Sequence, residues 1–133
     1  MKAGARMIHI TPPVFDPEAI KGKTDLTGAA GAKFTDYDSV LAAYSDWLMQ
    51  QKSKEGWEVL DLHSVMKSNL AASRAVDEHY IISKDGVHPG VEGHVMMAQV
   101  VLDAWAVPVS AQAIVKEGNI LSSGLRCRPS RRS

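Results

Sequence analysis

A chain of 133 residues with 45% hydrophobic and 23% charged residues has the composition of one ordinary globular domain. Lys plus Arg and Asp plus Glu number 15 each, so no net field attracts nucleic acid or an anionic membrane. The single cysteine, Cys127, excludes an internal disulfide, and without a transmembrane-length apolar run or a signal-peptide core the chain as written is read as cytoplasmic.

The first residues predict a chain that begins partway through a fold. Gly4 stands where the left-handed residue after a helix would stand, although no helix precedes it in the sequence. Residues 7–11 are apolar and β-prone, and the pair Pro12-Pro13 ends them. This stretch predicts a short buried strand.

A loop is expected over residues 12–31, because three prolines and three glycines interrupt it. A connection of this length is typical of a lid or a binding loop. Val14 and Phe15 either line a pocket there or pack against the core.

A strong helical pattern follows the loop. Its apolar positions are Tyr37, Val40, Leu41, Tyr44, Trp47 and Leu48. Thr35 and Asp38 resemble a capping box at its start, and Gly56 closes its end. The aromatic side chains of this stripe are expected to pack into the core rather than to bind a ligand.

A second buried strand is predicted over residues 57–62, entered from Gly56. Ser64 is expected to cap a helix over 65–76 that directs Met66, Leu70 and Ala71 inward. The alternation of strand and helix predicts an α/β fold with a parallel sheet covered on both faces.

The C-terminal third is predicted to be helical and then irregular. A helix is expected over 91–106, stopped by Pro108, and a short one over 110–117, ended by Gly118. Four arginines in the last eight residues, without apolar periodicity, indicate a disordered basic tail, with an anion or nucleic-acid contact as the alternative.

The stretch Lys84-Asp85-Gly86-Val87-His88-Pro89 carries the most chemistry. A loop bent at Gly86 and stiffened at Pro89 can fold the Asp85 carboxylate onto the His88 imidazole, three residues away. The carboxylate would hold one ring nitrogen protonated while the other takes a proton from a nucleophile. Asp85 as a simple turn former and His88 as a hydrogen-bonding loop residue are the alternatives.

Other polar residues are expected near the same rim of the sheet. Thr11, Pro12 and Pro13 follow the first strand and are candidates for a substrate-binding wall. Asp61 and His63 follow the second strand, where a capping role is preferred. His94 lies six residues after His88, which is not the spacing of a helical metal site, so it is read as packed or bracing the loop and no metal is expected.

These residues carry a family resemblance. Asp85-Gly86-Val87-His88-Pro89, followed by Gly93-His94, resembles the last block of the SGNH hydrolases, also called GDSL-type lipases and esterases, in which an Asp-x-x-His segment supplies two members of a Ser-His-Asp triad. Residues 4–13 and 56–62 resemble later strands of that family in the right order, so the resemblance covers about residues 3–107.

The resemblance implies a fold and an activity. The fold would be three-layer α/β/α with a flavodoxin-like parallel sheet of SGNH type that lacks its N-terminal strands: residues 1–107 would be its C-terminal part, and 108–133 a short helix and the tail. His88 would be the base and Asp85 its orienter, acting on a small ester or acetylated substrate without a cofactor. Nucleic acid and a membrane span are not expected.

The sequence departs from the family at the nucleophile. It has no Gly-Asp-Ser motif, and the blocks that build the family's oxyanion hole are missing as well. None of Ser39, Ser45 and Ser83 follows a strand-to-helix elbow. This chain alone is therefore expected to be nearly inactive, and its localisation is open because a signal peptide could precede it. The alternative is a non-catalytic module that binds a partner or forms homo-oligomers through an exposed sheet edge.

Overall fold

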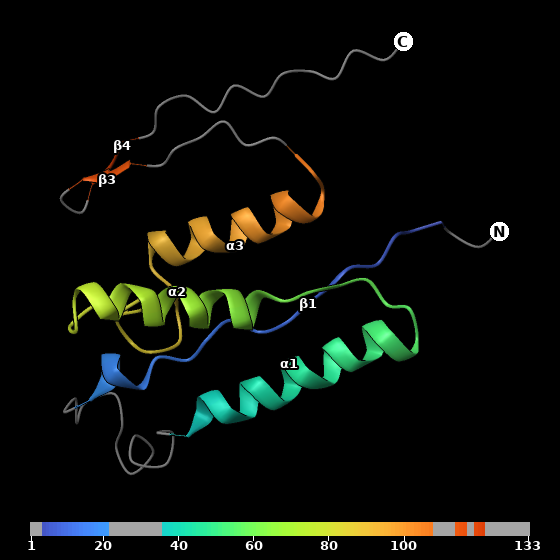
Figure 1. The fold of residues 1–133 in the computed structure, drawn as a ribbon, viewed down its shortest axis with the longest axis horizontal. Helices are drawn as coiled ribbons and strands as arrows, with labels where there is room; N and C mark the ends of the chain where they lie inside the picture. Colours follow the sequence, from blue (N-terminus) through green and yellow to red (C-terminus); the bar gives the residue numbers. More distant parts are fainter. Residues whose placement is uncertain (1–3, 22–35, 108–113, 117–118, 122–133) are drawn as a thin grey trace. The chain divides into compact units, whose positions relative to one another are not determined.

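The computed structural model describes residues 4–21, 36–107, 114–116 and 119–121. The contacts divide the chain into two compact units, residues 1–101 and 102–133. The elements shown in Figure 1 are β1 (His9–Ile10), a 3-10 helix (Pro17–Ile20), α1 (Tyr37–Lys54), β2 (Val59–Leu60), α2 (Leu62–Val76), α3 (Val91–Ala104), β3 (Ile114–Lys116) and β4 (Asn119–Leu121).

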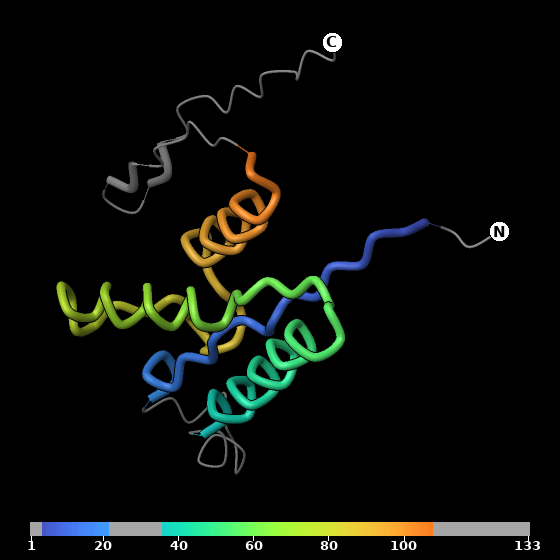
Figure 2. Tube along the Cα trace, turned by 45° about the vertical axis from the view of Figure 1, so that its right-hand side comes forward, coloured from blue at the N-terminus to red at the C-terminus, as the bar shows by residue number. Residues whose placement is uncertain are grey.

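The first unit contains a small parallel sheet. His9 pairs with Val59 and Ile10 with Leu60, and the Thr11 N–H donates to the Leu60 carbonyl at 3.0 Å. Figure 2 shows the N-terminal segment running alongside the segment that carries β2. The two predicted strands and their parallel pairing are confirmed, although each strand has only two residues. The prediction that the first strand is buried is wrong, because Ile10 is 47% exposed. The fold is thus α/β at the coarse level.

The core lies between α2, α3 and the loops around them. Its buried residues are Val14, Leu62, Met66, Leu70 and Ile82, covered by Tyr80, Met96, Met97 and Val100. Each fully buried aliphatic side chain contributes roughly 1.5–3 kcal/mol to stability. Val14 and Phe15 are 4% and 5% exposed, so the second reading of that loop, in which they pack against the core, is the one that the fold adopts.

Helix α2 starts earlier than predicted. Its N-cap is Asp61, whose carboxylate accepts from the Ser64 N–H at 3.0 Å, whereas Ser64 itself was the expected cap. An aspartate satisfies the free N–H groups of the first turn as well as a serine does. The capping role preferred for Asp61 is confirmed. Met66 and Leu70 are buried as predicted, whereas Ala71, also predicted to point inward, is exposed.

The aromatic stripe of α1 is not in the core, and the prediction that it packs there is wrong. Tyr44 is 62% and Trp47 is 52% exposed, and only Ser45 of this helix is buried. The helix faces the rest of its unit with another side, from which Lys52 donates to the Val59 carbonyl at 3.4 Å. Trp47 is partly covered by Trp57, with ring centroids 6.0 Å apart.

The second unit holds a hairpin where a helix was expected. β3 and β4 pair antiparallel, with Val115 opposite Ile120, so the predicted helix over 110–117 is wrong in its described part, 114–116. The β-branched residues of these segments favour strands over helices. Pro108 and the basic tail lie outside the described residues.

Candidate active site

The loop that carries Asp85 and His88 is closed at its base. Ser83 and Pro89 face each other in an isolated antiparallel bridge, and the Gly90 N–H donates to the Ile82 carbonyl at 2.9 Å. Within the loop, Gly86 has a φ of +81°, a conformation that residues with a Cβ rarely adopt. The turn predicted at this glycine is present.

Asp85 organises the backbone of this loop. Its Oδ1 accepts from the N–H of Val87 at 3.0 Å and from the N–H of His88 at 2.8 Å. The backbone N–H of His88, its ring nitrogen and the N–H of Val87 together hold the pKa of Asp85 far below its usual range. The carboxylate therefore stays ionised at neutral pH.

The second oxygen of this carboxylate lies against the imidazole. His88 Nδ1 and Asp85 Oδ2 are 2.6 Å apart, a distance typical of a short charge-assisted hydrogen bond. An ionised carboxylate only accepts hydrogen bonds, so it fixes the proton on Nδ1 and leaves the lone pair of Nε2 available to take one. The His88 side chain is 83% exposed, so Nε2 is open to a partner from outside.

Asp16 anchors the loop that carries Asp85 and His88, called the dyad loop below, to the rest of the fold. Its N–H donates to the Gly86 carbonyl at 2.9 Å, and a Cβ added to Gly86 would lie 2.9 Å from the Asp16 carbonyl oxygen. Its buried carboxylate accepts from Arg74 Nη2 at 2.6 Å and from the Ile82 N–H at 3.4 Å. Arg74 also donates from Nε to the Tyr80 carbonyl at 3.1 Å, so the segment that enters the loop is held from two sides.

Asp16 was missed in the sequence. The available signal was the pair Asp16-Pro17, which is typical of a helix start: the carboxylate does cap the short 3-10 helix through the Glu18 N–H at 3.2 Å. Its contact with Arg74 spans 58 residues of sequence. No local pattern reveals such a pairing.

Of the residues predicted to form a substrate-binding wall, Thr11 has a structural role. Thr11 is 1% exposed, and its hydroxyl accepts from the His63 N–H at 2.9 Å. Pro12 and Pro13 are partly exposed. No hydrogen bond among the described residues joins Thr11 to Asp85 or His88. Thr11 therefore couples the ends of the two strands, and the substrate-binding wall stays a prediction.

A second carboxylate-imidazole pair lies inside the same unit. His63 Nε2 is 3.1 Å from Asp38 Oδ1, which also accepts from the Phe15 N–H, and Lys67 donates to Asp38 Oδ2 at 2.8 Å. Burial raises the pKa of Asp38, but the hydrogen bonds from Lys67, Phe15 and His63 outweigh it and lower that pKa. Asp38 thus joins α1 to α2. Thr35, its partner in the predicted capping box, lies outside the described residues.

No metal site is found among the described residues, where no three His, Cys, Asp or Glu side chains are grouped to hold an ion. His94 braces the start of α3, with its Nδ1 2.9 Å from the Gly90 carbonyl oxygen.

The described serines place no hydroxyl in hydrogen-bonding contact with His88. Ser39 donates to the Asp36 carbonyl at 2.7 Å and Ser45 to the Leu41 carbonyl at 2.8 Å, each within its own helix. The Ser83 hydroxyl is buried and has no hydrogen-bond partner in the part of the chain that the structure describes. The pair of Asp85 and His88 is therefore a hydrogen-bonded carboxylate and imidazole with no serine hydroxyl from the described part of the chain against it.

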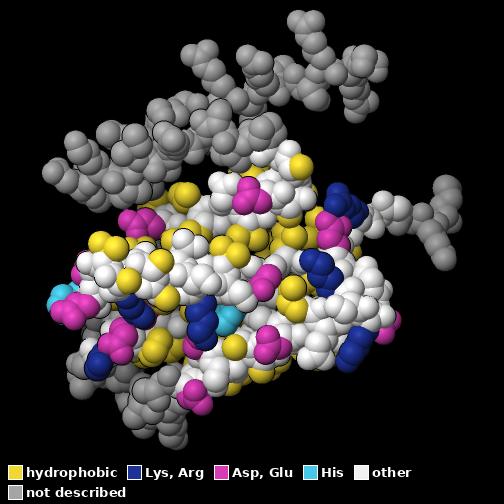
Figure 3. Space-filling view, viewed as in Figure 1, with side chains coloured by type: hydrophobic (Ala, Val, Ile, Leu, Met, Phe, Trp, Pro, Cys, Tyr) yellow, Lys and Arg dark blue, Asp and Glu magenta, His cyan; other side chains and the backbone are white. Residues whose placement is uncertain are grey.

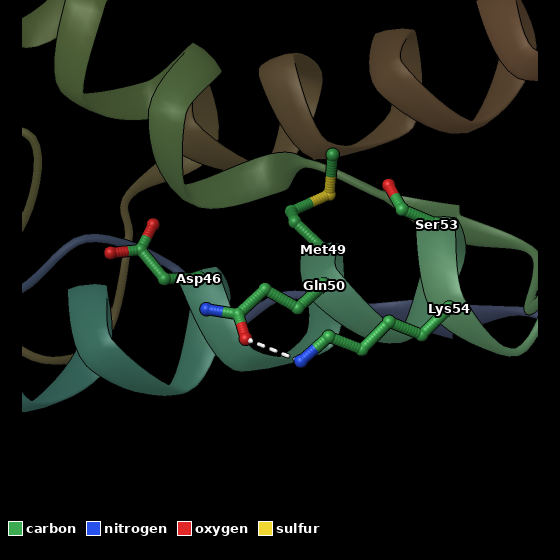
Figure 4. A pocket seen from close by; sticks show the side chains of 5 residues that line it. All are labelled: Asp46, Met49, Gln50, Ser53 and Lys54. Atoms are coloured by element: carbon green, nitrogen blue, oxygen red, sulfur yellow. Dashed lines mark hydrogen bonds between the residues drawn. The ribbon is translucent and has the colours of Figure 1, made fainter.

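Two surface pockets accompany these groups. The larger, of about 380 Å³, is lined by one face of α1 alone, where Lys54 donates to Gln50 (Figure 4). It contains no histidine and no group that contacts the dyad. The smaller, of about 190 Å³, lies between the entry to the dyad loop and the first turn of α3.

Comparisons with models of protein families, with curated proteins and with solved structures find no match to this chain. None of the helices in the described ranges is both long and apolar enough to cross a membrane. On the face seen in Figure 3, basic and acidic side chains alternate without forming a single-sign patch.

Proposed function

We propose that this chain carries the general base and the orienting carboxylate of a serine ester hydrolase of SGNH type. The observation that supports the proposal is the 2.6 Å contact between His88 Nδ1 and Asp85 Oδ2 on an exposed loop. A local Asp-x-x-His pair that leaves Nε2 accessible has the arrangement that a triad base requires.

The proposed reaction follows from that arrangement. As a serine hydroxyl attacks the carbonyl of a small ester or acetylated substrate, His88 Nε2 takes its proton and Asp85 stabilises the imidazolium. The imidazolium then returns the proton to the leaving alkoxide, and His88 next deprotonates the water that hydrolyses the acyl-enzyme. No cofactor takes part in these steps.

The attacking serine is proposed to come from a Gly-Asp-Ser block outside these 133 residues, in the same reading frame or in a separate chain. Loss of a triad serine lowers the rate by about 10⁶-fold in a well-studied protease. We therefore expect the 133-residue chain to hydrolyse p-nitrophenyl acetate no faster than His88→Ala does.

Two measurements test the proposal. Reading the coding DNA upstream of Met1 should reveal an in-frame Gly-Asp-Ser segment, or a neighbouring gene that encodes one. Coexpression with that segment should give an esterase that a serine-directed phosphonate inactivates. An upstream region and neighbours without such a block, together with no phosphonate-sensitive activity in cell extracts that contain the chain, would refute it.

Self-association is a second candidate function, favoured by the exposed aromatic stripe on α1. Tyr37, Val40, Tyr44 and Trp47 are spaced to share one helix face, and each is at least 38% exposed. Two copies could pair this face symmetrically. Sedimentation equilibrium should then give a dimer that Trp47→Glu dissociates and Gln50→Glu does not; a monomer at all concentrations would exclude it.

A further inference from the structure

The hydrogen bond between Asp85 and His88 depends on the backbone that carries it. The His88 side chain is 83% exposed and the Asp85 side chain 39%, so the packing of neighbouring side chains does little to orient either group. Water competes for hydrogen bonds at such positions, and an exposed charge pair is held only weakly by its own attraction. The 2.6 Å contact between the two side chains therefore requires a loop whose backbone is fixed from elsewhere.

The backbone of the dyad loop is fixed at Gly86, between the two residues of the pair. The Gly86 carbonyl accepts from the Asp16 N–H at 2.9 Å. The two backbones are so close that a Cβ added to Gly86 would lie 2.9 Å from the Asp16 carbonyl oxygen. A shift of Asp16 would therefore move Gly86, and with it the N–H groups that hold the Asp85 carboxylate.

Asp16 is held in turn by a buried ion pair with α2. Its side chain is 0% exposed, and its Oδ1 accepts from Arg74 Nη2 at 2.6 Å. A carboxylate that is removed from water is stable only when it is paired and hydrogen-bonded. The contact with Arg74 therefore fixes the position of Asp16 more firmly than an exposed ion pair does.

The same ion pair reaches the chain on both sides of the dyad loop. Before the loop, Asp16 Oδ2 accepts from the Ile82 N–H at 3.4 Å, and Arg74 Nε donates to the Tyr80 carbonyl at 3.1 Å. After the loop, Glu92 in the first turn of α3 accepts through Oε2 from the Tyr80 hydroxyl at 2.6 Å. The segments that enter and leave the loop are thus joined to one buried charge pair.

We infer that Asp16 and Arg74 are positioning residues for His88, whose buried ion pair keeps the dyad loop in the conformation that brings His88 Nδ1 against the Asp85 carboxylate. Without the ion pair the loop relaxes and the contact opens. The ring proton of His88 is then distributed over both nitrogens, because the carboxylate no longer selects one of them. The benefit to ester hydrolysis rests on the proposed function, but the hydrogen bond is a property of the 133-residue chain.

Nitrogen-15 NMR of the histidine rings tests the inference, because it reports which ring nitrogen carries the proton. The spectra are recorded at about pH 9, well above the ordinary histidine pKa of about 6.5. We expect His88 in the unmodified chain to be protonated mainly on Nδ1. In Asp16→Asn the ratio of Nδ1-protonated to Nε2-protonated His88 should fall about fivefold, as expected for one lost hydrogen bond. His79, which is 88% exposed and lies beside Glu78, should not change in the same spectra.

Arg74→Lys is the milder variant, which decides the test if Asp16→Asn does not fold. It keeps the positive charge but loses the fork that binds Asp16 and the Tyr80 carbonyl together, so it should shift the His88 ratio in the same direction and by less. The amide spectrum of each variant checks that it is folded.

The matched control is Asp61→Ala, which removes the N-cap at the opposite end of α2. This variant should lower stability but leave the His88 ratio unchanged, which separates positioning of the loop from a general loss of stability. A His88 proton shared between both nitrogens in the unmodified chain, an unchanged ratio in the folded variants of Asp16 and Arg74, or an equal fall in Asp61→Ala would overturn the inference. Because neither substrate nor serine enters the measurement, its result does not depend on the proposed ester hydrolysis.

Discussion

The molecule contains the same chemical pair twice, once on its surface and once inside. In the Asp85-His88 pair the imidazole is 83% exposed, whereas in the Asp38-His63 pair it is 4% exposed. The exposed imidazole can exchange a proton with a molecule that approaches it, and the buried one cannot be reached. Identical side chains therefore leave an imidazole open to solvent in one place and join two helices in the other, and their surroundings decide which.

The largest expected effect is on catalysis. If it were absent, the exposed pair would have no chemical role that distinguishes it from the buried pair. In the completed enzyme, His88→Ala should lower kcat by about 10⁴–10⁶-fold, because the serine loses its base. The matched control is His79→Ala, since the His79 side chain is also highly exposed, at 88%, and also lies near a carboxylate, that of Glu78. The measurement is kcat for ester hydrolysis by both variants. An equal loss of kcat in the two would contradict the role proposed for His88.

The next effect is on stability, and here the buried pair should matter more than the exposed pair. Asp38→Ala should lower the free energy of unfolding by about 2–4 kcal/mol, because it leaves the buried His63 without a partner. Asp85→Ala should lower it less, because the hydrogen bonds that it removes lie in an exposed loop. Urea unfolding at neutral pH measures both. If Asp85→Ala were the more destabilising, the division into a chemical and a structural pair would be wrong.

A third test sharpens the view that the dyad loop is held against Asp16. Gly86→Ala should destabilise the chain by about 1–3 kcal/mol, because the positive φ is strained and the new methyl meets the Asp16 carbonyl. Gly56→Ala is the control: its φ is also positive, at +67°, but no atom lies within 4 Å of its added Cβ. Thermal unfolding should show the larger loss for Gly86→Ala; equal losses would mean that the close approach has no cost.

The smallest effect is the pH dependence of the buried pair. The pKa of Asp38 is lowered in the folded chain, so its contribution to stability is present above the ordinary pKa of about 4 and is lost as the pH falls through the folded value. Asp38→Asn should therefore flatten the fall in unfolding free energy between pH 5 and pH 3. Urea titrations at the two pH values check this, and parallel curves for variant and parent would contradict it.

The two pairs also explain what could be predicted from the sequence. Asp85 and His88 are three residues apart on either side of Gly86, so their contact depends on local backbone geometry and could be predicted from the sequence. Asp38 and His63 are 25 residues apart and meet only because α1 and α2 pack together. Asp38 looked like a capping residue, since no local pattern reveals that it has a distant partner.

The same distinction applies to the helices and strands. The helix over 91–104 and the strand pair were predictable from apolar periodicity. The aromatic stripe of α1 was not, because periodicity identifies an apolar face without identifying what covers it. At 114–116 the short segment gave no decisive period, and its pairing with β4 decided the conformation.

Position 74 requires the shape of an arginine as well as its positive charge. Two of its nitrogens act on different targets, the Asp16 carboxylate and the Tyr80 carbonyl. A lysine ends in a single ammonium on a flexible stem and does not reproduce this rigid fork. Arg74→Lys would thus conserve the charge but lose one of the two hydrogen bonds. Exchange of arginine and lysine, which most protein surfaces tolerate, should be selected against at this position.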